Sequence, residues 1–161
     1  MELWDAYDEN LVKAENTVLV RGEPIPCGLF HLVCEILVKY IDGTYLLMQR
    51  DTRKHLGGMW EATAGGSALK GETPSECARR ELLEETGILS DALMPLGHET
   101  NLCHQTHYFE FLCHTDRKKD TVKLQDGETI AYKWVTKDEL LFMPQEMLAT
   151  RRIWKYMPDF E

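Results

Sequence analysis

The segment from Thr73 to Gly87 carries the start and stop signals of an α-helix at its two ends. Thr73 suits the N-cap, Pro74 suits the first helical position, and Glu76 completes the pattern of a capping box. Gly87 suits the left-handed residue that ends many helices. The sequence therefore predicts a helix whose limits are unusually well specified.

Three glutamates of this helix, Glu81, Glu84 and Glu85, stand at positions i, i+3 and i+4. At 100° per residue they share about a third of the helix circumference, and such like charges destabilise an isolated helix. Arg80 is suited to pair with Glu84 and orient it. Carboxylates on a rigid element are ligands that Mg²⁺ and Mn²⁺ prefer. A glutamate-rich helix face is also common on solvated surfaces, so the three residues alone leave both readings open.

The residues around the helix decide between these readings. Gly66 is followed by five residues, Glu72, seven residues and then the run RELLEETGI at 80–88. This segment resembles the Nudix box, G-x5-E-x7-R-E-U-x-E-E-x-G-U with U a bulky aliphatic residue, at every specified position. A chance match in a chain of this length has a probability on the order of 10⁻⁷. We therefore interpret the glutamate face as a metal site.

The resemblance implies the Nudix fold, an α/β (α+β) arrangement in which a mixed β-sheet is sandwiched between α-helices. It also implies a set of metal ligands for Mg²⁺, or Mn²⁺: Glu81, Glu84, Glu85 and the carbonyl of Gly66. Arg80 would orient the carboxylates, and Glu72 would act through the water shell of the metal. Family members take their general base from the box or from a later loop.

Glu128, in the run DGETIAYKWV, is our candidate for a base from a later loop. An exposed glutamate at the end of a strand is an equally good reading of this residue, since glutamate side chains prefer the surface.

The implied activity is hydrolysis of a diphosphate linkage in a nucleoside diphosphate-type small molecule. Arg50, Arg53 and Lys54 precede the box and are candidates for phosphate binding, although an ordinary solvated loop has the same composition. Trp60 and Tyr108 could stack on a base, but aromatic residues in strands more often pack in the core.

Two other functions compete with hydrolysis. The opening WDAYDEN, His31 and the triplet Ala64-Gly65-Gly66 resemble the branch that contains isopentenyl-diphosphate isomerase. Those isomerases place a catalytic cysteine and a metal-binding histidine before the helix, where this chain has Gly65 and Ser67, and they lose part of the glutamate set that this chain retains. A non-catalytic nucleotide-sensing Nudix domain is the second competitor, and the same retained glutamates disfavour it.

Alternation of apolar residues, turn residues and breakers predicts strands mixed with a few helices in a single domain over residues 1–161. The expected strands are Phe30–Tyr40, Thr44–Gln49 after a turn at Asp42-Gly43, Trp60–Ala64 leading into a turn at Gly65-Gly66, His104–His114 and Thr129–Val135. The expected additional helices are Lys137–Met143 and Gln145–Tyr156.

The net charge of −9 disfavours general nucleic-acid binding, because an acidic field repels phosphate backbones. No apolar run approaches the roughly 20 residues that cross a bilayer, and the first residues lack a signal-peptide pattern. We therefore expect a cytoplasmic protein with reduced thiols. Homodimers are common in the family that the box resembles, so a homodimer is compatible with the sequence.

A group of cysteines and histidines lies between residues 103 and 114, and it raises the question of a zinc site. The group consists of Cys103, His104, His107, Cys113 and His114. Its spacing contains no CxxC or HxxxH pair, and strand alternation would place the side chains on opposite faces. We expect ordinary strand residues.

Overall fold

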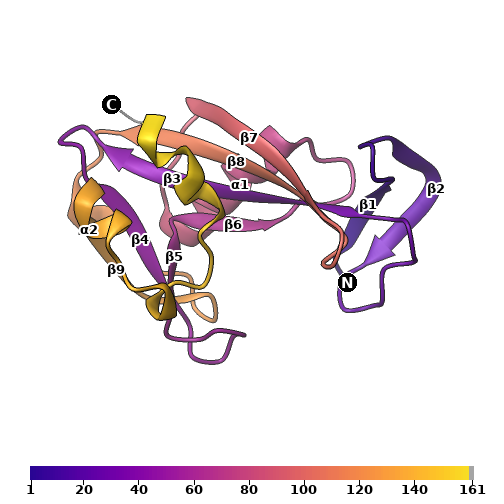
Figure 1. Ribbon diagram of the computed structural model, residues 1–161, viewed down its shortest axis with the longest axis horizontal. Coiled ribbons are helices and arrows are strands. Elements are labelled where there is room, and N and C mark those ends of the chain that lie inside the picture. Colours follow the sequence, from indigo (N-terminus) through magenta and orange to yellow (C-terminus); the bar gives the residue numbers. More distant parts are fainter. Residues whose placement is uncertain (160–161) are drawn as a thin grey trace.

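The computed structural model describes residues 1–159 and contains one large mixed sheet and one small one (Figure 1). In the large sheet the order is β5-β4-β3-β8-β7, while β6 also pairs with β3 and β9 with β4. The strands are β3 (His31–Tyr40), β4 (Tyr45–Arg50), β5 (Trp60–Ala62), β6 (Ala64–Ser67), β7 (Leu93–Asn101), β8 (Thr106–Thr115) and β9 (Thr129–Val135). β3 and β8 run parallel over ten residue pairs, whereas the other paired strands are antiparallel.

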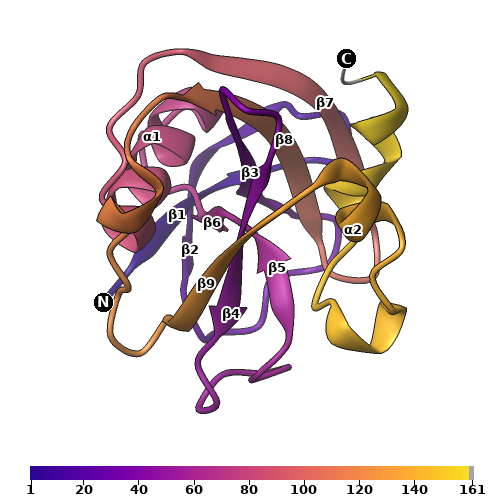
Figure 2. The same cartoon turned by 90° about the vertical axis from the view of Figure 1, so that its left-hand side faces the viewer.

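Helical elements cover both faces of the large sheet, as the fold prediction requires (Figure 2). Helix α1 (Pro74–Thr86) buries Ala78 and Leu82 against the side chains of β3 that include Ile36. The opposite face, which includes Leu37 of β3, is covered by α2 (Lys137–Leu141) and by residues of the 3₁₀ segment η3 (Arg152–Asp159). Two further 3₁₀ turns are η1 (Lys119–Thr121) and η2 (Gln145–Met147). Alternation along β3 thus supplies both halves of the core.

The limits of α1 are those that the sequence predicts. The Thr73 hydroxyl accepts a hydrogen bond from the Glu76 amide, and the Glu76 carboxylate accepts one from the Thr73 amide. Gly87 ends the helix in the left-handed region at φ 72°, and its N–H donates to the Leu83 carbonyl. Both ends of the helix therefore satisfy backbone groups that would otherwise lack partners.

A β-hairpin of β1 (Leu3–Tyr7) and β2 (Lys13–Val20) forms the small sheet, which the sequence analysis did not anticipate. The hairpin is bound to the loop before α1, because the Lys70 amide donates to the Leu3 carbonyl at 2.8 Å and the Gly71 amide donates to Asp5 at 2.8 Å. Lys13 also pairs with Asp5. These contacts fix the hairpin relative to the helix.

Gly65 and Gly66 do not form the turn that we expected. They lie in strand β6, where they pair with Glu35 and Cys34 of β3. A Cβ atom on Gly65 would lie 2.7 Å from the Cys34 carbonyl oxygen, closer than van der Waals contact allows. These glycines therefore permit a close approach of two strands rather than a reversal of the chain.

The helix expected at Gln145–Tyr156 is also wrong, because the segment divides into η2 and η3. Between them Leu148 forms a parallel bridge to Trp60, and the Ala149 amide donates to the Trp60 carbonyl at 2.8 Å. This pairing keeps the backbone at Leu148 and Ala149 in an extended conformation before η3 begins. The helix expected at Lys137–Met143 is shorter than predicted and ends at Leu141. Among residues 1–159, no helix has the length and apolar character needed to cross a membrane.

Glu110 of β8 is fully buried, and its Oε1 has no hydrogen-bond partner within the described residues. Burial raises the pKa of Glu110 to about 7, although the Lys155 ammonium lies 3.8 Å away. An unfolded glutamate has a pKa of about 4.3, so the protonated carboxyl favours the folded state at low pH. That stabilisation is lost as the pH rises through the folded-state pKa.

We expect Glu110→Gln to raise the free energy of unfolding by about 1–3 kcal/mol at pH 8 and to change it little at pH 4. Glutamine keeps the shape of the side chain but cannot ionise. Urea unfolding at both pH values measures the difference, and Glu15→Gln, at an exposed position of β2, serves as the control. An equal effect of Glu110→Gln at the two pH values would contradict this role of its ionisation.

Candidate active site

A polar cleft of about 480 Å³ is lined by all the residues that the sequence predicts for the catalytic site except Glu72. Three parts of the chain supply them: strand β6, helix α1 and the turn before β9. The predicted residues that line the cleft are Gly66, Arg80, Glu81, Glu84, Glu85 and Glu128. The fold thus brings together a set that spans 62 positions in the sequence, from Gly66 to Glu128.

Glu81 lies directly against the backbone of Gly66. A Cβ atom on Gly66 would lie 2.7 Å from Glu81 Oε2, and still closer to the rest of the carboxylate. Burial raises the pKa of Glu81, and the guanidinium of Arg80 opposes this shift. A side chain at position 66 would therefore displace the Glu81 carboxylate, which explains the glycine.

Glu85 is buried, with 6 % of its surface exposed, so it does not belong to a solvated helix face. Burial raises the pKa of Glu85 well above its ordinary value, and the nearby carboxylates of Glu81 and Glu61 raise it further. The Glu84 side chain, by contrast, is 47 % exposed. Part of the glutamate set is thus desolvated and mutually repulsive, an arrangement that a bound cation stabilises.

Arg80 connects the carboxylates of the box. Its Nε and Nη2 donate to the two oxygens of Glu72 at 2.7 and 2.9 Å, and its Nη1 donates to Glu81 at 2.7 Å and Glu84 at 3.3 Å. The predicted pairing with Glu84 is present, and the Glu72 and Glu81 bonds are shorter. Glu72 also accepts the Leu69 amide and does not line the cleft. In this structure Glu72 contacts the cleft through Arg80.

Glu128 and Lys54 form an ion pair at the margin of the cleft. The Asp51 amide donates to the Glu128 carbonyl at 2.9 Å, which fixes this part of the backbone. Among the other basic residues of the loop, Arg50 lines the cleft, whereas Arg53 is bound to Asp51 and Asp126 and does not. The basic loop therefore contributes two of its three predicted cations to the site.

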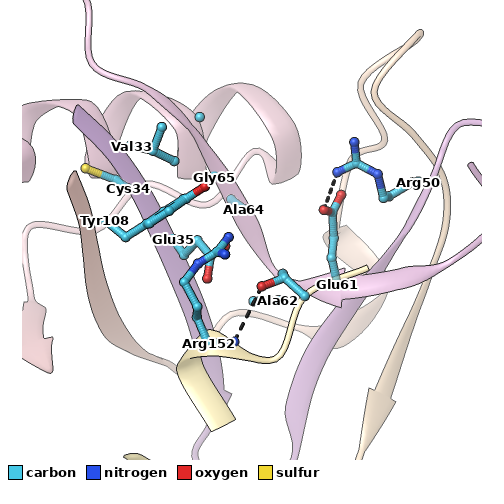
Figure 3. Close-up of a pocket in the computed structure, with 12 residues that line it drawn as sticks. Val33, Cys34, Glu35, Arg50, Glu61, Ala62, Ala64, Gly65, Tyr108 and Arg152 are labelled. Atoms are coloured by element: carbon cyan, nitrogen blue, oxygen red, sulfur yellow. Dashed lines mark hydrogen bonds and ion pairs between the residues drawn. The ribbon is translucent and has the colours of Figure 1, made fainter. Parts of the chain in front are cut away.

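A second pocket, of about 200 Å³, adjoins the cleft and shares Arg50, Gly65 and Gly66 with it. Figure 3 shows Tyr108, Glu35 and Arg152 on one side of this pocket and Arg50 with Glu61 on the other. The two openings therefore lie on either side of shared residues of strand β6 and Arg50.

In this second pocket the Arg152 guanidinium lies 3.6 Å from the centroid of the Tyr108 ring and donates to Glu35 Oε1 at 2.5 Å. Glu35 Oε2 and Arg152 Nε are buried without a hydrogen-bond partner among the described residues. Burial raises the pKa of Glu35, and Arg152 opposes the shift. Buried polar atoms of this kind are rare and are frequently ligand contacts.

Tyr108 is a candidate for base stacking from the sequence alone, whereas Glu35 and Arg152 were not predicted. A single charged residue inside the apolar run HLVCEILV was the available signal for Glu35. Trp60, the other aromatic candidate, lines neither opening and instead has the Lys133 ammonium 4.1 Å from its ring centroid.

The cysteines and histidines between 103 and 114 are dispersed in the fold. His107 is buried and lies within hydrogen-bonding distance of the Asp8 carbonyl and the Thr100 hydroxyl, whereas Cys103 is exposed in the turn between β7 and β8. Within residues 1–159, no three acidic, histidine or cysteine side chains converge on a ready-made metal position. Glu81 and Glu84 do not converge on one point because both carboxylates are bound to the Arg80 guanidinium.

The donor atoms around Gly66 nevertheless fit a hard divalent cation. They are carboxylate and carbonyl oxygens, and two of the carboxylates, Glu81 and Glu85, have raised pKa values in part because each lies near other acidic groups. Hard oxygen ligands suit Mg²⁺ and Mn²⁺. Arg80 holds Glu81 through Oε1, so Glu81 Oε2, which lies beside Gly66, could bind the ion while that pairing is kept.

The sequence-family model that describes the NUDIX domain matches residues 33–160 of this chain, and this segment includes every predicted catalytic residue. An uncharacterized Nudix hydrolase of Listeria monocytogenes is 33% identical over 146 residues, covering 87% of this chain and 83% of the relative. An uncharacterized Nudix hydrolase of Rhodococcus erythropolis is 29% identical over 172 residues, covering 98% and 85% of the two chains.

Solved structures share the fold at lower identity. DR0079 from Deinococcus radiodurans superposes with a TM-score of 0.80 at 18% identity, covering 99% of this chain and 100% of the other. The NUDIX domain of Shewanella oneidensis NrtR, solved with ADP ribose, gives a TM-score of 0.62 at 17% identity and covers 79% and 84% of the two chains. With its complete box and this match over most of its length, the chain belongs to the Nudix hydrolase family, whose members act on pyrophosphate bonds.

Proposed function

We propose that the protein is a Mg²⁺-dependent pyrophosphohydrolase, with Mn²⁺ as an alternative ion, that cleaves the diphosphate linkage of a nucleoside diphosphate-type small molecule. The observation that carries the proposal is that the two openings adjoin each other and share Arg50, Gly65 and Gly66. The cleft holds the box glutamates, and the adjoining pocket contains the buried Glu35 carboxylate, whose Oε2 has no hydrogen-bond partner among the described residues. A diphosphate in the cleft would place the rest of the molecule in the pocket.

The glutamates of α1 and the carbonyl of Gly66 would hold the metal, with Arg80 keeping Glu81 and Glu84 in position. A bound Mg²⁺ supplies charge neutralisation at the diphosphate and acidifies water. Lys54 and Arg50 would pair with phosphate oxygens, because both line the cleft and carry the charge that phosphate recognition needs.

Glu128 is the proposed general base, and it would accept the proton of the attacking water at the edge of the cleft. The water oxygen forms the new bond to phosphorus, and the anhydride P–O bond breaks with its electron pair passing to the departing phosphate. No covalent bond to the protein is required. Glu85 is the alternative base from within the box. If the Glu128→Gln variant retains a normal kcat, Glu128 is not the base and the role falls to Glu85.

The pocket favours a group that donates hydrogen bonds. Glu35 Oε2 can accept one from an amino, imino or hydroxyl group, and Tyr108 with its stacked Arg152 forms a flat wall. Nucleobases and riboses have these donors. A nucleotide ligand is also what the NrtR domain of similar fold holds, namely ADP ribose.

The test is a product assay on the purified protein with Mg²⁺ and with EDTA. The substrates are ADP-ribose, NADH, dinucleoside polyphosphates, nucleoside di- and triphosphates, and isopentenyl diphosphate. Release of a nucleoside monophosphate, phosphate or diphosphate that requires the metal would support the proposal. Isomerisation of isopentenyl diphosphate without hydrolysis would support the isomerase instead, and tight nucleotide binding without any product would support a sensor.

A further inference from the structure

The N-terminal hairpin forms part of the wall of the catalytic cleft. Glu2, Trp4 and Arg21 line the cleft together with the residues of the box. These three residues lie outside the segment 33–160 that matches the family model. Figure 1 shows the hairpin at the end of the molecule away from the C-terminus, beside the large sheet. Nothing in the family box therefore accounts for this part of the cleft.

The position of this wall is fixed by contacts to the loop that precedes α1. The bonds from the Lys70 and Gly71 amides to Leu3 and Asp5 tie β1 to that loop. The Trp4 ring also stacks on His31 at the start of β3, with a centroid separation of 4.4 Å. The hairpin is therefore held to both the loop before α1 and the central strand, which fixes the backbone of β1 relative to the glutamates.

Arg21 is the cation that the hairpin presents to the cleft. Its Nη1 donates to Glu2 Oε2 at 2.7 Å, and its side chain is 64 % exposed. Glu2 is held independently, because its Oε1 accepts the Trp4 indole N–H at 2.8 Å. The pairing with Glu2 raises the pKa of Arg21, with smaller contributions from Glu128 and Glu81. Arg21 is thus within the electrostatic reach of the catalytic carboxylates.

The ion pair between Arg21 and Glu2 is easily exchanged. Water screens an exposed pair of this kind, so it contributes little to stability. A guanidinium forms stronger, charge-assisted and often bidentate bonds with phosphate. Glu2 would keep its bond from Trp4 after the exchange. Arg80, by comparison, is occupied by three carboxylates and cannot turn away without releasing the box.

We propose that Arg21 binds a phosphate of the substrate and positions the diphosphate from the hairpin side of the cleft. The inference rests on the proposed function, since it assigns a further substrate contact to that same site. Arg21 is a positioning residue for an anionic phosphate group, and Glu2 holds it in place before substrate arrives.

The experiment measures binding of α,β-methylene-ADP, a diphosphate probe with a carbon bridge, by calorimetry in the presence of Mg²⁺. Arg21→Gln is expected to weaken the Kd about tenfold, the loss of one charge-assisted bond. KM for whichever substrate the wild type cleaves should rise by a similar factor, while kcat stays within about threefold. Arg21→Lys should recover part of the affinity. Arg79→Gln removes an equal charge from α1 at an ion pair with Asp91 outside the cleft, and should bind as the wild type does.

Glu2→Gln separates binding from a structural role of the ion pair. It breaks the same pair but leaves the cation in the cleft, so the probe should bind as tightly as to the wild type or more tightly. Equal weakening by Glu2→Gln and Arg21→Gln would mean that the pair only supports the hairpin, and would overturn the inference. An unchanged Kd in Arg21→Gln would overturn it too, while cleavage by the wild type would leave the proposed function standing. A wild type that neither binds nor cleaves any diphosphate would defeat both.

Discussion

Replacing Glu85 with glutamine is expected to reduce kcat by at least about 100-fold, because it removes one of the carboxylates implied to hold the metal. The substitution should not destabilise the folded protein. Burial and the carboxylates of Glu81 and Glu61 raise the pKa of Glu85, so a neutral side chain of the same shape relieves repulsion in the metal-free protein. We expect the thermal midpoint of metal-free Glu85→Gln at pH 8 to equal or exceed that of the wild type.

Single-turnover kinetics and thermal melts of the same preparations measure both effects. Glu146→Gln, at an exposed position of η2, is the matched control and should change neither. Full activity of Glu85→Gln would remove Glu85 from the metal site. Lost activity together with a much lower thermal midpoint would indicate a structural defect in place of a lost ligand.

The second large effect is expected at Gly66. A methyl group at this position would collide with the carboxylate of Glu81, which is the far end of a flexible side chain and can move away. The Glu81 oxygens would then leave the site, so Gly66→Ala should lose at least about 100-fold in kcat/KM and bind Mg²⁺ more weakly. The free energy of unfolding should change by less than about 1 kcal/mol, because the three atoms nearest to the added methyl group all belong to the end of the Glu81 side chain.

Gly65→Ala is the matched comparison for this prediction. Its Cβ atom would lie 2.7 Å from the Cys34 carbonyl oxygen, which is held in the β3–β6 pairing and cannot move cheaply. We expect Gly65→Ala to lower the thermal midpoint strongly, in contrast to Gly66→Ala. Magnesium titration and thermal melts of the two variants separate the effects. If Gly66→Ala also unfolds early, or retains full activity, the explanation for that glycine is wrong.

The parts of the fold with local signals were predictable from the sequence. The helix α1 has its capping residues within its own segment, and β9 ends where an apolar run ends. The box glutamates lie along one cleft because their spacing is fixed by the helix itself. The burial of Glu85 was not predictable, since it depends on where the large sheet meets that helix.

The features that the sequence did not reveal depend on contacts between distant segments. Glu35 and Arg152 are 117 positions apart, and neither carries a local signal for the other. Likewise, the bridge between Leu148 and Trp60 replaces the expected helix with an extended segment. The hairpin was not predicted because β2 is largely exposed and its sequence lacks the alternation of apolar and polar residues that marks a half-buried strand.

The long separation of Glu35 from Arg152 has a consequence for the order in which the protein is assembled on the ribosome. Residues 2–128 contain every side chain of the glutamate cleft, so that cleft can form while the chain is still being made. The neighbouring pocket needs Thr150 and Arg152, which emerge later. A nascent chain would therefore contain all the residues of the glutamate cleft before those of the pocket around Glu35.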